Sequence, residues 1–96
     1  MDLRINAIHF DASEKLVAFI NKKTDKLEHR NPSIATIDVT LKVVKPETSL
    51  NKQAIVEVTV PQHPAFVADK TADTFEEAID LALEALDRQL EKVKNR

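Results

Sequence analysis

Hydrophobic and polar positions alternate along four short stretches of this chain. The alternation predicts strands over residues 3–8, 36–43, 54–60 and 65–69. The second and third of these stretches are joined by a polar connector, so we expect them to form a hairpin with a longish loop.

Two longer stretches repeat their apolar residues at helical spacing instead. The first predicted helix begins after Ser13, a favourable N-cap residue, and continues to about His29, close to Pro32, which disfavours helical geometry before it. The second begins at the capping box Thr74-x-x-Glu77 and runs to Arg96. The resulting order, β-α-β-β-β-α, predicts an α+β two-layer sandwich: a four-stranded sheet with both helices on one face. Residues 1–96 are expected to form one domain.

The second helix sorts its charges by side. At about 100° per residue, its apolar residues share one face, its acids a second arc and its bases a third stripe. The acidic arc holds Glu76, Glu77, Asp80, Glu84, Asp87 and Glu91, and the basic stripe holds Arg88, Lys92 and Arg96. Opposite charges at i,i+4 stabilise a helix, so a helix that only had to stay soluble would mix the two signs. The sorting therefore indicates a function for the basic stripe.

The first helix also carries its bases on one flank, namely Lys15, Lys22, Lys23, Lys26 and Arg30. If the basic flanks of the two helices face each other, they bound a positive groove that can contact the phosphates of a nucleic acid. The acidic arc is then expected to be an outward, solvated face.

Composition excludes several kinds of site. The chain has no cysteine and no glycine, which removes disulfides, thiolate chemistry and glycine-rich phosphate loops. Its three histidines stand in separate elements without metal-ligand spacing, so we expect neither a metal nor a cofactor. The acidic arc lacks the pocket that acid–base catalysis needs, and no serine stands in a nucleophile elbow. We therefore expect no enzyme.

Net charge and aromatic content indicate which kinds of nucleic acid the chain could bind. The net charge of −2 argues against a protein that coats nucleic acid through bulk positive charge, although a local basic surface remains possible. With no Tyr or Trp and four Phe, the chain offers little support for stacking on single strands. Folded RNA, contacted through its shape and phosphates, fits better. The chain shows no signal peptide and no apolar run of about 20 residues, so we expect a cytoplasmic protein.

The closing helix resembles that of the ribosome hibernation-promoting factor and protein Y family. The resemblance rests on the run Asp73-x-Phe75-x-x-Ala78-Ile79-Asp80, followed by Leu86-x-x-Gln89-Leu90-x-Lys92-x-Lys94. The opening strand, the lysine-rich first helix and Leu41-Lys42-Val43-x-Lys45 also resemble the family, so the similarity covers essentially the whole chain.

This resemblance implies a bacterial, cytoplasmic translation inhibitor. Such proteins bind the small ribosomal subunit in slow growth or stationary phase, as part of a stress response, and occupy the channel for messenger and transfer RNA. The implied contacts to ribosomal RNA come from Lys22, Lys23, Lys26, Arg88, Lys92 and Lys94. With the other bases of the two flanks, the predicted RNA-binding set is Lys15, Lys22, Lys23, Lys26, Arg30, Arg88, Lys92, Lys94 and Arg96. The chain resembles the short members of the family, and we expect a monomer away from the ribosome.

Two other functions stay open at this point. Double-stranded RNA-binding domains have a similar α-β-β-β-α layout but use lysines at the start of the last helix, where this chain has Asp73-Thr74-Phe75-Glu76-Glu77. Alternatively, the acidic arc of the second helix binds a basic protein partner.

Overall fold

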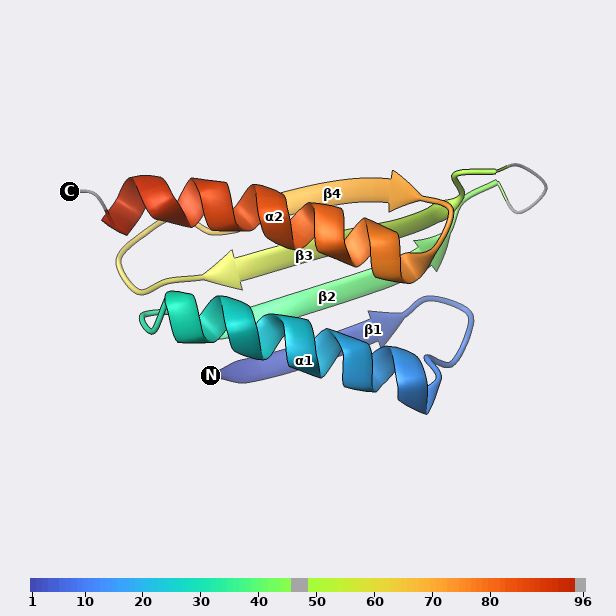
Figure 1. Cartoon of the computed structure of the whole chain (residues 1–96), viewed down its shortest axis with the longest axis horizontal. Helices are drawn as coiled ribbons and strands as arrows, with labels where there is room; N and C mark the ends of the chain where they lie inside the picture. The colour runs from blue at the N-terminus through green and yellow to red at the C-terminus, as the bar shows by residue number, and fades with distance from the viewer. Residues whose placement is uncertain (46–48, 95–96) are drawn as a thin grey trace.

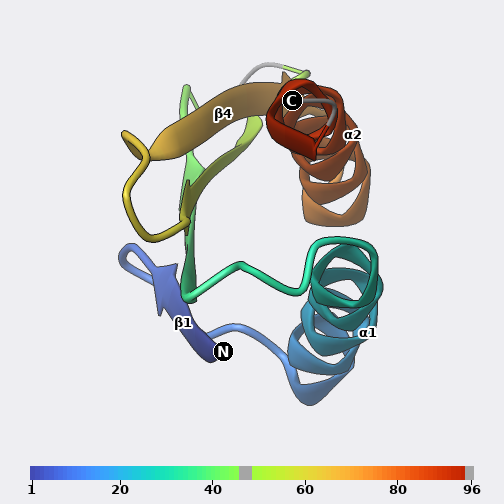
Figure 2. The same ribbon diagram turned by 90° about the vertical axis from the view of Figure 1, so that its left-hand side faces the viewer.

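Two helices lie side by side across one face of a four-stranded sheet (Figures 1 and 2). This computed structural model describes residues 1–45 and 49–94. Its elements are β1 (Asp2–Ala7), α1 (Glu14–Arg30), β2 (Thr36–Val43), β3 (Lys52–Thr59), β4 (Phe66–Ala72) and α2 (Phe75–Lys94). The predicted β-α-β-β-β-α sandwich is confirmed.

The sheet is mixed, with the strand order β1-β2-β3-β4. β1 and β2 are parallel, which requires a crossover connection, and α1 supplies it. The predicted hairpin of β2 and β3 is confirmed as an antiparallel pair, in which Val39 lies opposite Val56 and Leu41 opposite Ala54. These four side chains are fully buried, so this face of the sheet is the one that the helices cover.

Each helix is attached to the sheet by a stripe of buried side chains. From α1 these are Leu16, Ile20, Thr24 and Leu27, and from α2 they are Ala78, Ile79, Ala82, Leu83, Leu86 and Leu90. Both stripes follow helical spacing, and the apolar residues Val17, Phe75 and Val93, which share that spacing, are only partly buried. The hydroxyl of Thr24 stays within this core because it donates a hydrogen bond to the carbonyl of Ile20 at 2.8 Å.

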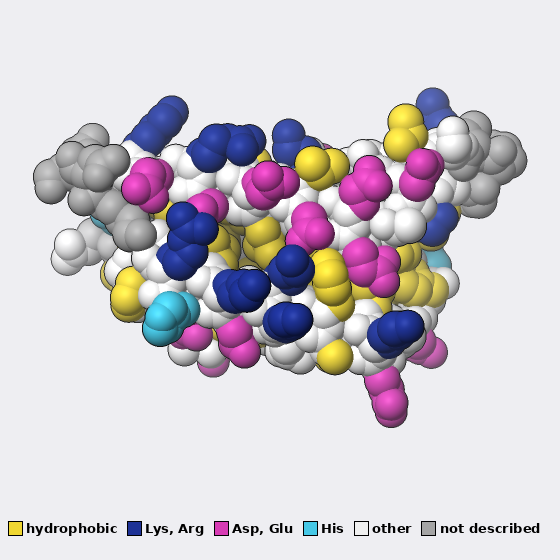
Figure 3. Space-filling view, in the orientation of Figure 1, with side chains coloured by type: hydrophobic (Ala, Val, Ile, Leu, Met, Phe, Trp, Pro, Cys, Tyr) yellow, Lys and Arg dark blue, Asp and Glu magenta, His cyan; other side chains and the backbone are white. Residues whose placement is uncertain are grey.

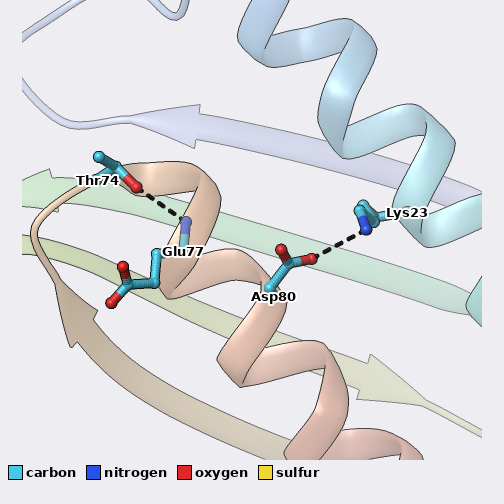
Figure 4. Close-up of polar contacts among 4 residues, drawn as sticks. All are labelled: Lys23, Thr74, Glu77 and Asp80. Carbon is cyan, nitrogen blue, oxygen red and sulfur yellow. Dashed lines mark hydrogen bonds and ion pairs between the residues drawn. The ribbon is translucent and has the colours of Figure 1, made fainter.

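Side-chain caps fix both helix starts. Ser13 Oγ accepts a hydrogen bond from the backbone N–H of Leu16 at 3.1 Å, and Thr74 Oγ1 accepts one from that of Glu77 at 3.1 Å (Figure 4). These bonds satisfy donors that have no partner within the helix. α1 ends at Asn31, whose side-chain Nδ2 donates to the carbonyl of Leu27 at 3.0 Å.

The fourth strand is longer than its predicted end at Asp69. It continues to Ala72, because Lys70 and Ala72 pair with Ala54 and Lys52 of β3. Lys70 and Thr71 are two consecutive polar residues, both exposed at the sheet edge, so they interrupt the alternation of hydrophobic and polar positions from which the strand was predicted. Residues 95 and 96, predicted as the end of the second helix, lie outside the described residues.

Two leucines of α2 test how much the buried stripe contributes. Leu86 is fully buried and Leu81 is 39% exposed. We expect Leu86→Ala to lower the free energy of unfolding by about 2–5 kcal/mol, because it removes apolar contacts and leaves a cavity. Leu81→Ala is the matched control and should cost less than about 1 kcal/mol. Urea denaturation of both variants measures the difference, and equal losses would contradict this assignment of the core.

Candidate nucleic-acid interface

A groove of about 530 Å³ lies between α1 and α2. Its charged lining from α1 is mostly basic, namely Lys23, Lys26 and Arg30 with His29 and one acid, Asp25, and its charged lining from α2 is Asp80, Glu84 and Asp87. The buried side chains of Leu27 and Leu83 contribute apolar lining between the two charged walls. The groove therefore carries mainly bases on the α1 side and only acids among the charged residues on the α2 side.

Two ion pairs join the helices across this groove. Lys23 Nζ lies 3.3 Å from Asp80 Oδ1 (Figure 4), and Arg30 Nη2 lies 3.0 Å from Asp87 Oδ2. The two bases are seven residues apart on α1, and the two acids are seven residues apart on α2. This equal spacing corresponds to about two helical turns and shows that the helices run in the same direction.

The expected groove with bases from both helices is wrong, because the acids of α2 face α1. Asp80 and Asp87 belong to the arc that was expected to be outward and solvated, yet both are partly buried between the helices. The buried stripe of α2 sets the rotation of the helix and thereby turns this flank toward α1. Arg88 and Lys92 line a hollow with Arg30 of α1, and the acids Asp87 and Glu91 line the same hollow.

The other flank of α2 approaches the sheet edge. Gln89 Nε2 donates a hydrogen bond to the carbonyl of Val67 in β4 at 3.3 Å. Lys92 lines a second hollow on this side together with His63 and Phe66. The basic stripe of α2 therefore points mainly away from the groove.

The predicted bases of α1, which we call the basic cluster, are Lys15, Lys22, Lys23, Lys26 and Arg30. Figure 3 shows Lys and Arg side chains gathered over α1, a row of Asp and Glu side chains over α2, and further Lys and Arg side chains along the upper edge of the view. Within the described residues, Lys15, Lys22 and Lys26 are exposed and make no ion pair, so their charges are available to an external anion.

The predicted RNA-binding residues of α2 are more scattered. Arg88 and Lys92 are exposed on its C-terminal half. Lys94 is the last residue of the helix, and Arg96 lies outside the described residues. The structure thus brings Lys23, Lys26 and Arg30 together along the groove, and places Arg88 and Lys92 beside Arg30.

Aromatic contacts brace the other end of the helix pair. Phe10, in the loop before α1, stacks on Phe75 at the start of α2, with ring centroids 5.1 Å apart. Lys23 Nζ lies 5.4 Å from the ring centroid of Phe19, a cation–π contact that helps to hold this lysine between its aromatic neighbour and Asp80.

Sequence reasoning missed the acids as groove residues. The available signal was the matching seven-residue spacing of Lys23 and Arg30 on one helix and of Asp80 and Asp87 on the other. Asp87 has a further property that no pattern reveals, since its Oδ1 is buried and no donor in the described part of the chain reaches it. A buried acceptor without a donor costs about 1–3 kcal/mol. The groove therefore contains an unmet acceptor.

The described ranges, 1–45 and 49–94, contain no group of three or more His, Asp or Glu side chains that could hold a metal ion. In the same ranges, neither helix has both the length and the apolar character that a membrane span requires.

Comparison with known families identifies the chain. Residues 3–96 match the model of the family described as sigma 54 modulation protein / S30EA ribosomal protein. The chain belongs to this family. The resemblance to the hibernation-promoting factor and protein Y family is thereby confirmed, and the S30EA assignment makes the chain a member of a ribosome-associated group of proteins.

Solved structures share the S30EA fold. A ribosomal subunit interface protein from Coxiella burnetii is similar with a TM-score of 0.87 and 23% sequence identity, over 100% of both chains. The N-terminal domain of Thermus thermophilus protein Y is similar with a TM-score of 0.80 and 16% identity, over 97% of this chain and 99% of that one. No curated protein sequence gives a significant match.

A double-mutant cycle measures the interhelical ion pair of Arg30 and Asp87. We expect Arg30→Ala, Asp87→Ala and the double variant to give a coupling of about 0.2–1 kcal/mol in urea denaturation, because Arg30 is largely exposed and water screens the pair. The coupling should shrink in 1 M salt. As a control, Arg30→Ala and Glu57→Ala, on opposite layers of the fold, should be additive. Full additivity of Arg30 and Asp87 at low salt would contradict the pairing.

Proposed function

We propose that residues 1–96 act as a single ribosome-binding domain that inhibits translation. In this proposal the protein binds ribosomal RNA of the small subunit in the channel used by messenger and transfer RNA, in the cytoplasm of slowly growing or stationary-phase cells. It acts by occupying that channel as a monomer, without a catalytic step or a cofactor. Support comes from membership of the S30EA family and from the Coxiella relative, which is described as a ribosomal subunit interface protein.

The observation that carries the proposal is the basic cluster of α1. Lys15 and Lys26 are eleven positions apart, so the exposed lysines extend over about 16 Å at 1.5 Å per residue. That length is enough to contact several phosphates of one RNA strand. Such contacts position a protein on RNA and make its affinity depend on salt.

The bases of α2 extend this surface. Arg88 and Lys92 line a hollow with Arg30, together with the acids Asp87 and Glu91, and so continue the cluster toward the C-terminal half of α2. Lys94 and Arg96 complete the proposed set, the first by its match to the family pattern and the second by its place in the basic stripe.

The start of α2 argues against a domain that recognises plain duplex RNA. Double-stranded RNA-binding domains contact phosphates across a groove at this position. Here Glu76 and Glu77 are exposed in the first turn, where their charges repel phosphates. The basic cluster instead extends along the other helix, from Lys15 to Arg30.

Removal of two lysine charges tests the basic cluster. We expect Lys22→Gln/Lys26→Gln to weaken binding to purified small subunits and to reduce the slope of log K against log salt by about 1.4–1.8, because each lost phosphate contact contributes about 0.7–0.9. Co-sedimentation across a series of KCl concentrations measures this slope. The matched control, Arg4→Gln/Lys42→Gln, removes two exposed charges from the opposite face of the sheet and should leave the slope unchanged. Equal effects of the two variants would refute the assignment.

The same assay tests the contribution of α2. We expect Arg88→Gln/Lys92→Gln to lower the slope as well, by about 0.7–1.8 depending on whether one or both side chains reach a phosphate. An unchanged slope would remove these two residues from the interface and leave α1 as its only basic element.

Competition with plain duplex RNA separates the proposal from duplex recognition. An excess of a 20-base-pair RNA should displace little protein from small subunits, because the proposed site is a folded surface of ribosomal RNA. Efficient displacement by the duplex would favour a general double-stranded RNA-binding module.

A further inference from the structure

The groove between α1 and α2 contains carboxylates and apolar lining, which contacts to phosphates do not explain. We propose that it binds one unpaired guanine nucleotide of the bound RNA, with the base against the carboxylates of α2 and its phosphate toward the bases of α1. This inference rests on the proposed function and adds a base preference to it.

The α2 wall consists of acceptors only. Asp80, Glu84 and Asp87 present carboxylates, which accept hydrogen bonds and cannot donate them while ionised. Within the described residues Glu84 is exposed and makes no ion pair, so its carboxylate is open to a ligand, whereas Asp87 Oδ1 is buried and Asp87 Oδ2 is paired with Arg30. A ligand that fits this wall must therefore present donors to it.

Guanine is the base whose Watson–Crick edge meets that requirement best. It presents N1–H and the N2 amino group side by side, a pair of donors that matches one carboxylate. Adenine and cytosine place a single amino group beside a ring acceptor, and uracil places its N–H between two carbonyls, which a carboxylate repels. An edge already paired in a duplex offers none of these donors, so the nucleotide has to be unpaired.

The α1 wall includes Asp25, but its bases Lys23, Lys26 and Arg30 outnumber that acid, so this wall suits the phosphate of the same nucleotide. Lys26 is exposed and unpaired within the described chain, and the side chain of Arg30 is 61% exposed. Arg30 reaches into the groove through its contact with Asp87 Oδ2. If the guanidinium turns toward a phosphate, with which it forms bidentate hydrogen bonds, the Asp87 carboxylate becomes available to the base.

The size and lining of the groove agree with a nucleotide. Its volume of about 530 Å³ falls within the usual range of small-ligand sites, about 300–1,000 Å³. Leu27 and Leu83 supply apolar surface for the ring, and Figure 3 shows hydrophobic surface between the basic and acidic rows. A nucleotide bound here therefore contacts the bases of α1, the carboxylates of α2 and the apolar lining between them.

Fluorescein-labelled RNA pentamers test this preference by fluorescence anisotropy at low salt. The sequences UUGUU, UUIUU, UUAUU and UUUUU differ only in the central base, and inosine lacks the N2 amino group of guanine. We expect UUGUU to bind at least about fivefold more tightly than UUAUU or UUUUU, the lower end of discrimination by a bidentate contact, with UUIUU in between. Free GMP should bind more weakly than UUGUU, and equal affinity would assign the groove to a free nucleotide instead.

Two carboxylate variants locate the preference. Glu84→Gln and Asp87→Asn keep the shape of the side chains, and we expect each to reduce the ratio of UUGUU to UUUUU affinity while UUUUU binding stays the same or rises. The matched control is Glu57→Gln, on the opposite face of the sheet, which should leave the ratio unchanged. Urea denaturation verifies that all three variants are folded.

The inference is overturned if the four pentamers bind equally, if none binds at millimolar concentration, or if the variants raise all four affinities by the same factor. The last result would mean that the acids only neutralise neighbouring bases. Wild-type binding to small subunits is measured in parallel. Intact ribosome binding without a guanine preference refutes this inference alone, whereas loss of ribosome binding refutes the proposed function.

Discussion

The burial of one apolar stripe from each helix against the sheet fixes how both helices are rotated, and the charged surface follows from that rotation. Ile20 of α1 and Leu86 of α2 are fully buried in these stripes. Full burial of one such side chain contributes about 1.5–3 kcal/mol, whereas an exposed ion pair contributes about 0.2–1 kcal/mol. The stripes therefore decide the orientation. Asp80 and Asp87 are carried with α2 toward α1, and their ion pairs form as a consequence.

This orientation makes the net charge of −2 a poor guide to what the surface binds. In the face that Figure 3 shows, bases gather over α1 and a row of acids lies over α2, while Arg88 and Lys92 are exposed on the C-terminal half of α2. Packed helices lie about 8–10 Å apart, close to the Debye length of about 10 Å at 0.1 M salt. An anion at the outer side of α1, near Lys15 and Lys22, is thus largely screened from α2. An anion that reaches Arg30 is attracted by the bases of α1 and repelled by the carboxylates of α2.

The elements of the fold could be predicted because each is encoded locally, by alternation, helical spacing and caps such as Ser13 and Thr74. The members of each charged flank could be predicted for the same reason. The sequence does not allow us to predict which flank of each helix faces the neighbouring helix. A helical wheel gives angles within one helix and no position for the next helix. That position depends on the strand order, which places α2 over β3 and β4. With α2 on the other side of α1, Arg88 and Lys92 would have faced the groove.

Acids within a surface that contacts RNA have opposite effects on affinity and on specificity. A carboxylate such as Glu84 repels every phosphate that approaches it, so it weakens binding to all sequences alike. A base that donates hydrogen bonds to the same carboxylate recovers this loss, and other bases do not. Specificity is a difference between affinities, and it therefore rises even where the absolute affinity falls. A helix pair with bases on α1 and acids on α2 is suited to selecting one RNA surface among many, whereas a uniformly basic pair would bind them all.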